Sequence, residues 1–128
     1  GPNSLGIWTQ AQGPDVASGG YLLANDGVPH AIVDGFLKAR GHIGDRLIAA
    51  MQAGLAQGGE AGPVHSAGLK IVDTVNWPVA DLRCDWTDAC PIRALADLWA
   101  IYKPQLDAYV QRALDPRAAP SYGVPGDE

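Results

Sequence analysis

The segment that most constrains the fold of this 128-residue chain runs from Asp81 to Trp86, because charged and apolar side chains alternate along it without interruption. Successive side chains of a β-strand point to opposite faces, so this pattern predicts a strand with one charged face and one apolar face. The charged positions are Asp81, Arg83 and Asp85, and the apolar positions are Leu82, Cys84 and Trp86. We expect the apolar face to pack inside the domain. The charged face is then either a solvated surface or the wall of a polar cleft.

The rest of the chain divides into segments with a period of two and segments with a period near 3.6. Residues 5–12 and 16–24 are predicted strands, and Gly13-Pro14-Asp15 between them indicates a hairpin turn. A second predicted pair of strands covers residues 64–72 and 78–86. The two pairs predict antiparallel sheets joined by the helical segments between them.

Apolar side chains recur at helical spacing in three further segments. The positions that we expect on the buried helix faces are Val28, Ile32, Val33, Phe36 and Leu37, then Leu47, Ile48, Met51 and Leu55, and finally Ile92, Leu95, Trp99, Tyr102, Leu106 and Tyr109. Pro29 suits the first turn of the first helix, and Gly41 suits the left-handed position that follows it. Pro104 predicts a kink or break in the last helix.

The resulting order, ββααββα, predicts an α+β fold with mostly antiparallel strands. We expect one folded region over residues 1–114, followed by a Pro- and Gly-rich tail over residues 115–128. Such a tail either is disordered or lies across a partner. No glycine-rich loop stands between a strand and a helix in the way that phosphate binding requires, so no nucleotide cofactor is predicted.

Composition excludes several classes of function. The formal net charge is −5 and no run of Lys or Arg occurs, which argues against binding to nucleic acid. No apolar run reaches the ~18 residues of a membrane helix, and the start of the sequence lacks the features of a signal peptide. Cys84 and Cys90 are predicted to be reduced thiols of a cytoplasmic protein. The scattered histidines predict no metal site.

Several short motifs, in a consistent order, resemble one known family. They are Gly44-Asp45-Arg46-Leu47-Ile48-Ala49-Ala50, Gly54-Leu55-Ala56-Gln57-Gly58-Gly59-Glu60, His65-Ser66-Ala67-Gly68-Leu69, Val79-Ala80-Asp81-Leu82-Arg83-Cys84-Asp85 and Pro91-Ile92-Arg93-Ala94-Leu95. Over roughly residues 4–103, the chain looks like the C-terminal half of the domain-of-unknown-function 1028 family, which is placed with the N-terminal-nucleophile (Ntn) hydrolases.

This resemblance implies part of a four-layer αββα sandwich and an amide-bond hydrolase. In the Ntn mechanism, a Thr, Ser or Cys at residue 1 attacks an amide carbonyl, and its own α-amino group acts as the base. Gly1 has no nucleophilic side chain, so the resemblance implies that the nucleophile lies on a second polypeptide or on a missing N-terminal segment. No residue of this chain is then predicted to be catalytic, and the chain alone is expected to be inactive.

The strongest candidate for substrate binding is Arg83, flanked on its strand face by Asp81 and Asp85. The arginine would bind a substrate carboxylate through two parallel hydrogen bonds while the two aspartates hold it in place. The alternative is a ladder of charges that only sets the strand register. Two carboxylates four residues apart on a strand are ~13 Å apart. This distance is too long for the acid and base of a glycosidase.

Three further residues are candidate site residues. His65 is predicted to be a buried or interface histidine or else a contributor to substrate binding; its neighbour Ser66 points to the opposite face, so the two cannot form a nucleophile–base pair. Asn25 is either a cap for the following helix or a donor beside that helix N-terminus. Tyr21 stands where the family that the chain resembles usually has an Asn, an amide donor that could stabilise an oxyanion.

A second hypothesis is a non-catalytic binding or assembly module. A partial sandwich leaves apolar surface open, which pairing with itself or with another chain would cover. Tyr102, Tyr109 and the segment Pro120-Ser121-Tyr122-Gly123 are the candidate contacts for such an oligomer.

Overall fold

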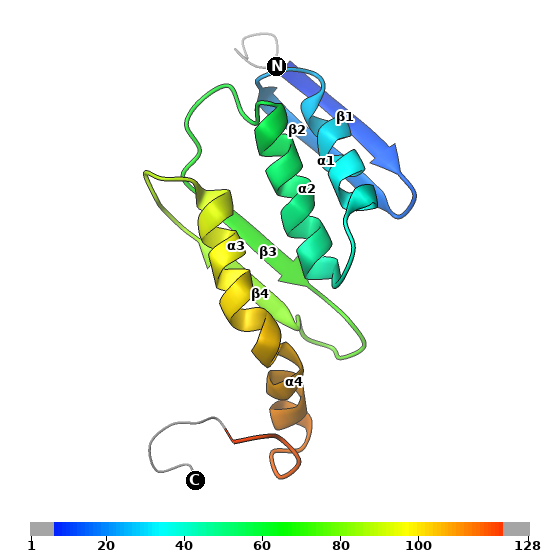
Figure 1. The fold of residues 1–128 in the computed structure, drawn as a ribbon, viewed down its shortest axis with the longest axis vertical. Helices are drawn as coiled ribbons and strands as arrows, with labels where there is room; N and C mark the ends of the chain where they lie inside the picture. Colours follow the sequence, from blue (N-terminus) through cyan, green and yellow to red (C-terminus); the bar gives the residue numbers. More distant parts are fainter. Residues whose placement is uncertain (1–6, 122–128) are drawn as a thin grey trace.

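The structure is a computed structural model and describes residues 7–121 (Figure 1). The elements in chain order are β1 (Ile7–Gly13), β2 (Val16–Leu23), α1 (Val28–Lys38), α2 (Ile43–Gln57), β3 (Ala67–Ile71), β4 (Ala80–Cys84), α3 (Pro91–Tyr102), the 3₁₀ turn η1 (Lys103–Gln105) and α4 (Leu106–Leu114). The predicted order ββααββα is confirmed, with the last helix divided into two. Leu5 and Gly6 of the first predicted strand, and Tyr122 and Gly123 of the tail, lie outside the described residues.

The strands form two separate antiparallel pairs, β1 with β2 and β3 with β4. Gly13 pairs with Val16, so the first hairpin turns through Pro14 and Asp15 alone. Asp15 has φ of 60° in this turn, a left-handed conformation that Asp tolerates better than most side chains. In the second pair, Leu69 lies opposite Leu82 and Lys70 lies opposite Asp81.

The second pair of strands is shorter than the sequence pattern predicts. His65 and Ser66 precede β3 instead of lying within it, and Asp85 and Trp86 follow the end of β4. The expectation that Trp86 shares a buried face with Leu82 and Cys84 is wrong, since Trp86 is 69% exposed. Alternation does not reveal where backbone pairing ends, so the pattern continued past the true end of the strand.

Helices α1 and α2 pack closely because glycines lie at their contact. A Cβ atom on Gly35 would come within 2.6 Å of the Ala53 side chain, and one on Gly54 within 2.6 Å of Ile32. Pro29 lies in the first turn of α1, as predicted. Gly41, two residues after the C-cap of α1, has positive φ as predicted, and Gly58, the C-cap of α2, has positive φ as well.

The last helical region breaks at the predicted proline. Helix α3 ends at Tyr102, and Pro104 lies in the 3₁₀ turn η1 before α4 begins. Proline lacks the backbone N–H that would continue the α-helical ladder, so the chain tightens into the turn and changes direction. Figure 1 shows α4 continuing away from the rest of the fold.

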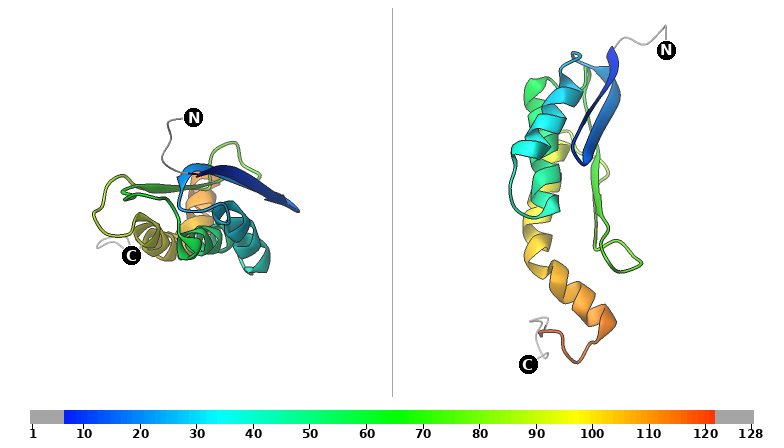
Figure 2. Two further views of the ribbon diagram at one scale, coloured as in Figure 1. Left: turned by 90° about the horizontal axis from the view of Figure 1, so that it is seen from above. Right: turned by 90° about the vertical axis from the view of Figure 1, so that its right-hand side faces the viewer.

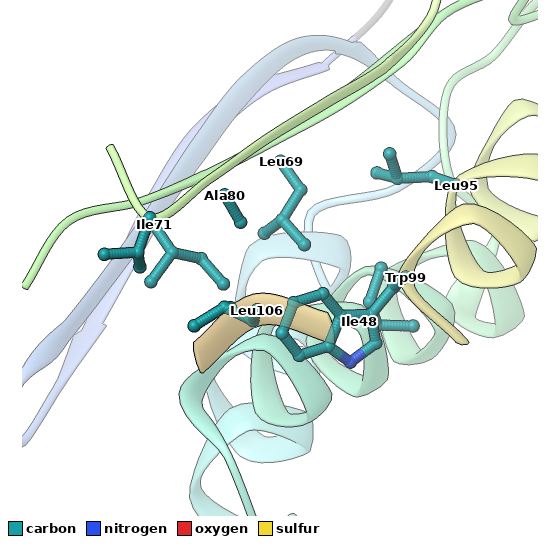
Figure 3. Close-up of a cluster of buried hydrophobic side chains, with 8 residues drawn as sticks. Ile48, Leu69, Ile71, Ala80, Leu95, Trp99 and Leu106 are labelled. Atoms are coloured by element: carbon teal, nitrogen blue, oxygen red, sulfur yellow. The ribbon is translucent and has the colours of Figure 1, made fainter. Parts of the chain in front are cut away.

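Both strand pairs lie on the same side of α1, α2 and α3, which gives one strand layer and one helix layer (Figure 2). The main core fills the space between β3–β4 and the helices (Figure 3). Its buried members are Ile48, Leu69, Ile71, Val79, Ala80, Leu95, Trp99 and Leu106. The strand residues in this set alternate along the chain, so the helix-facing side of the pair is the apolar side predicted from the sequence.

Two apolar residues of α2 are not buried as their helical spacing predicts. Met51 is 42% exposed and Leu55 is 45% exposed. The buried residues of this helix are Gly44, Ile48, Ala50 and Gly54. Small side chains allow α2 to approach its neighbours closely, while Met51 and Leu55 face a hollow between the strand pairs. Within the described part of the chain, no helix is long and apolar enough to cross a membrane.

Candidate functional site

A cleft of about 300 Å³ lies between β2 and β3. Its walls come from both strands, from the facing side of α2 and from the start of α3. Apolar and small residues dominate the lining, including Gly19, Gly20, Gly68, Val28, Ile32, Met51, Leu55, Ile92 and Leu95. Three residues with polar side chains, Tyr21, Glu60 and Ser66, also line it.

The cleft offers little acid–base chemistry of its own. Ser66 and Cys90 lie in its wall, but no hydrogen bond is observed from either side chain to a basic group in the described chain. A hydroxyl or thiol without an adjacent base or a depressed pKa is a weak nucleophile. Cys84 and Cys90 are both free thiols. The cleft is therefore mainly apolar, and no nucleophile–base pair is observed among its described residues.

The charged stripe lies on the face of β4 that points away from the helices. Asp81 and Arg83 are exposed, whereas Ala80 and Leu82 between and beside them turn toward the core. Arg83 Nη2 donates to Asp85 Oδ2 at 3.3 Å, while Asp81 Oδ2 lies 3.9 Å from Lys70 Nζ on the neighbouring strand.

Asp81 therefore does not help to hold Arg83, in contrast to the predicted three-residue arrangement. The Arg83 and Asp85 side chains are 69% and 78% exposed. Ion pairs at such exposure contribute ~0–1 kcal/mol to stability. In the described chain the guanidinium is therefore held by a weak contact and has room to turn toward a ligand.

His65 is stacked on Trp86. The two ring centroids are 3.9 Å apart and the planes differ by 8°. The Nδ1 atom of His65 is 3.0 Å from the carbonyl oxygen of Thr87, so Nδ1 carries the proton and donates it, since a carbonyl can only accept. Asp88 Oδ1 lies 3.7 Å from the same nitrogen. With 32% of its side chain exposed, His65 is half-buried, and its Nε2 remains the atom for any outside contact.

Asn25 is tied into the backbone between β2 and α1. Its Oδ1 accepts from the Gly27 N–H at 3.0 Å, and its Nδ2 donates to the carbonyl of Gln57 at 2.9 Å. These bonds join the start of α1 to the end of α2, although Gly27 itself is the N-cap residue. Asn25 therefore does not cap α1, whose first turn has no side-chain cap hydrogen bond. Its side chain instead forms a local turn with Gly27 and links that turn to the end of α2.

Tyr21 is 64% exposed and lines the cleft near the Leu23 end of β2. The structure thus places the six predicted residues in three groups. Arg83, Asp85 and Asp81 share the outer face of the β3–β4 pair, His65 lies beside Trp86, and Tyr21 and Asn25 lie along and just after β2.

Sequence reasoning missed the most highly connected carboxylate of the described chain, that of Asp45. It accepts hydrogen bonds from Trp99 Nε1 at 2.9 Å, Lys103 Nζ at 2.7 Å and the His42 backbone N–H at 3.1 Å. The bond from Lys103, followed by that from Trp99, lowers the pKa of Asp45, while burial opposes the shift. The available signal was an acidic residue three positions after His42, which is the spacing of a capping box.

The described residues contain no cluster of three or more His, Cys, Asp or Glu side chains that could hold a metal ion. The fold and the cleft together define a small mixed α/β protein with two antiparallel strand pairs on one side of a helix layer. The sequence profile of a family described as "Family of unknown function (DUF1028)" matches residues 1–95, so this chain belongs to the DUF1028 family.

A solved relative confirms the fold. The crystal structure of a DUF1028 protein from Silicibacter pomeroyi superimposes with a TM-score of 0.71 at 22% sequence identity. The match covers 83% of this chain but 45% of the relative, so this chain spans less than half the length of that protein. No curated protein gives a significant match to the sequence.

Proposed function

We propose that this chain supplies one strand layer and one helix layer to an Ntn-type amide-bond hydrolase. The nucleophile of that enzyme would lie on another polypeptide or on a segment outside this chain. The remaining two layers of an αββα sandwich would then come from that same polypeptide or segment. This chain would contribute substrate-binding residues, among them Arg83, Asp85 and His65.

The observation that carries the proposal is the open outer face of the strand layer. Helices cover one side of both strand pairs, and no described element covers the other side (Figure 2). Trp8 and Tyr21 are 69% and 64% exposed, and the Arg83 guanidinium lies on the outer face of β4. A second sheet packed on that face would enclose the Arg83 side chain, as the αββα arrangement requires. The length of the solved relative leaves room for such a sheet.

The chemistry proposed for the complete enzyme is hydrolysis through a covalent intermediate. The nucleophile adds to the amide carbonyl carbon, and the C–N bond breaks as the amine leaves with the proton taken from the nucleophile. Water then cleaves the resulting ester or thioester and regenerates the nucleophile. In this scheme Arg83 binds a carboxylate of the substrate through paired hydrogen bonds.

The test uses the protein isolated from its source cells under native conditions. Intact-mass measurement identifies any additional polypeptide, and a screen of N-acyl amino acids, small amides and lactams measures hydrolysis. For a substrate that carries a carboxylate, we expect Arg83→Ala to lower kcat/KM at least ~10-fold, the loss of one charge-assisted contact. The matched control is Arg93→Ala, which removes an exposed arginine on α3 and should have no effect.

Two results would contradict this proposal. One is native material that consists of residues 1–128 alone, because no nucleophile would then be available. The other is hydrolysis that is equally fast in the Arg83 and Arg93 variants, which would remove Arg83 from substrate binding.

The alternative function, an assembly module without catalysis, is favoured by one observation. Met51 and Leu55 expose apolar surface in the cleft, and exposed apolar surface of this kind often marks an interaction site. Light scattering separates the hypotheses further. Oligomers of this chain alone, together with inactivity toward every amide tested in the native material, would support the module.

A further inference from the structure

The two strand pairs present free edges to the same cleft. Within residues 7–121, β2 pairs along its length only with β1, and β3 pairs only with β4. Gly19, Gly20 and Tyr21 of β2 line the cleft on one side, and Ala67 and Gly68 of β3 line it on the other. A free strand edge presents a row of backbone donors and acceptors that can pair with another strand. Glycine and alanine at both edges allow another backbone to approach closely.

The edge of β2 already shows that it can pair on this side. Leu23 forms an isolated antiparallel bridge with Glu60, in which the Ala24 N–H donates to the Gly59 carbonyl at 2.9 Å. The Ala61 N–H donates to the Leu22 carbonyl at 2.7 Å. The connection between α2 and β3 therefore occupies one end of this edge. The part of the edge at residues 19–21 remains available to another strand.

Helix α2 forms the floor of the cleft. It packs against α1 on one side and α3 on the other, while β1–β2 pack on α1 and β3–β4 pack mainly on α3, with β3 also in contact with α2 (Figure 1). Neighbouring helices lie ~8–10 Å apart, so the centres of the two strand pairs are separated by ~16–20 Å. Strands in a sheet are ~4.8 Å apart. Subtracting half a spacing for each pair leaves ~11–15 Å between β2 and β3, which accommodates one or two additional strands.

The floor is chemically suited to carry such strands. Met51 and Leu55 both line the cleft and are 42% and 45% exposed, although their helical spacing is that of buried residues. An extended strand that crosses α2 would present alternate side chains to this floor. Apolar residues at those alternate positions would cover Met51 and Leu55, as the core side chains of β3 and β4 cover α3.

We infer that the cleft accepts one or two extended strands of the polypeptide that completes the family domain. These strands join β1–β2 and β3–β4 into one continuous sheet over α2. The inference rests on the proposed function, which requires such a polypeptide. It specifies where that polypeptide enters and how it is recognised, by backbone pairing at two edges and by apolar contacts with α2. More than half of the solved relative lies outside the region matched by this chain, which is ample length for the strands.

Amide hydrogen exchange measures the edge pairing directly. The protein isolated natively from its source cells is compared with this chain alone. Successive N–H groups of a strand point to opposite edges, so only some amides of residues 19–21 and 67–68 point into the cleft. We expect those amides to exchange at least ~100-fold more slowly in the native material, because stable pairing protects strand amides. The amides of α4, which is distant from the cleft, serve as the internal control and should exchange equally in both samples.

A charge placed on the cleft floor measures the apolar contacts. Met51→Glu should leave the Tm of this chain alone nearly unchanged, since the side chain is half exposed there. In the native material, the same variant should lower the Tm by at least ~5 °C, because a carboxylate would be buried without a partner. The control is Ile101→Glu on α3, which is 65% exposed and does not line the cleft.

The results separate the two hypotheses. If the native material contains an additional polypeptide but the edge amides exchange rapidly, or if Met51→Glu and Ile101→Glu behave alike, strand insertion is wrong while the proposed function stands. If the native material is this chain alone, the proposed function fails and the strand insertion fails with it. Slow exchange at both edges, together with a destabilising effect confined to Met51→Glu, supports the inference.

Discussion

Asp45 joins the start of α2 to the end of α3, and its removal should be among the more costly substitutions of a polar side chain in this fold. Oδ1 accepts from the indole N–H of Trp99, which is itself only 4% exposed. Oδ2 accepts from Lys103 Nζ and from the backbone N–H of His42. In Asp45→Ala the indole donor would remain inside the core without an acceptor, and the first turn of α2 would lose half of its capping box.

The magnitude follows from the three contacts. The hydrogen bond from a buried indole to a carboxylate contributes ~1.5–3 kcal/mol. The half-exposed ion pair with Lys103 adds ~0.2–1 kcal/mol, and the capping bond adds ~0.5–1 kcal/mol. Because contacts that share one carboxylate are not additive, we expect Asp45→Ala to lower the free energy of unfolding by ~2–4 kcal/mol. This corresponds to a fall of roughly 10 °C in Tm.

The effect should depend on pH in one direction. The lowered pKa of Asp45 means that the folded state favours the ionised carboxyl. Its contribution to stability is therefore fully present above the unfolded pKa of ~4 and is lost as the pH falls through the lower folded pKa. Urea unfolding followed by circular dichroism at pH 7 and at pH 3 measures both values. The difference between wild type and Asp45→Ala should shrink toward acid.

The control for this experiment is Asp97→Ala, which removes an exposed carboxylate from α3 itself. It should change the free energy of unfolding by less than ~0.5 kcal/mol. A loss below ~1 kcal/mol for Asp45→Ala at pH 7 would refute the assignment of Asp45 as an anchor. An equal loss at pH 3 and pH 7 would show that the ionised form is not the stabilising species.

Three further predictions concern packing, burial and the charged stripe. Gly44→Ala should destabilise the fold by ~1–3 kcal/mol in urea unfolding, because its Cβ would come within 2.3 Å of the Trp99 ring; Gly62→Ala, with no atom within 4 Å, should be neutral. Tyr102→Phe should cost ~1–2 kcal/mol by removing the 2.7 Å hydrogen bond to the Val79 carbonyl. Burial raises the pKa of Tyr102, so the contribution of its hydroxyl to the free energy of unfolding should be complete below pH ~10 and disappear as the pH rises through the folded pKa. A loss of stability for Tyr102→Phe that stays constant at high pH would contradict this. Arg83→Ala should alter the stability of this chain by less than ~0.5 kcal/mol, because the side chain is 69% exposed; a larger change in thermal unfolding would point to a structural role.

The elements that could be predicted from the sequence are those with a local physical cause. Pro104 cannot continue a helix, and the break occurs there. The turn through Pro14 and Asp15 follows from the fixed φ of proline and the tolerance of Asp for positive φ. The alternation of charged and apolar side chains likewise predicted which side of β4 faces the helices, since Arg83 is exposed while Leu82 packs against the core.

The features that could not be predicted depend on contacts between distant residues. Nothing local indicates that the indole of Trp99 reaches Asp45, which lies 54 positions earlier. The end of β4 depends on pairing with β3, so the alternation through Trp86 overestimated its length. The partners of the charged stripe depend on the neighbouring strand in the same way, because Asp81 lies 3.9 Å from Lys70 on β3 while Asp85 contacts Arg83.

The disagreement at Met51 and Leu55 bears most directly on the cleft. Their spacing places them on the buried face of an amphipathic helix, yet both are exposed in this chain. Elsewhere on α2 the burial predicted from this spacing is confirmed, since Ile48 is 7% exposed within the core. The apolar stripe of α2 is thus covered at one end and open over the cleft at the other. If the proposed additional strands fill the cleft, they would cover Met51 and Leu55 and so account for the core-like spacing of these two residues.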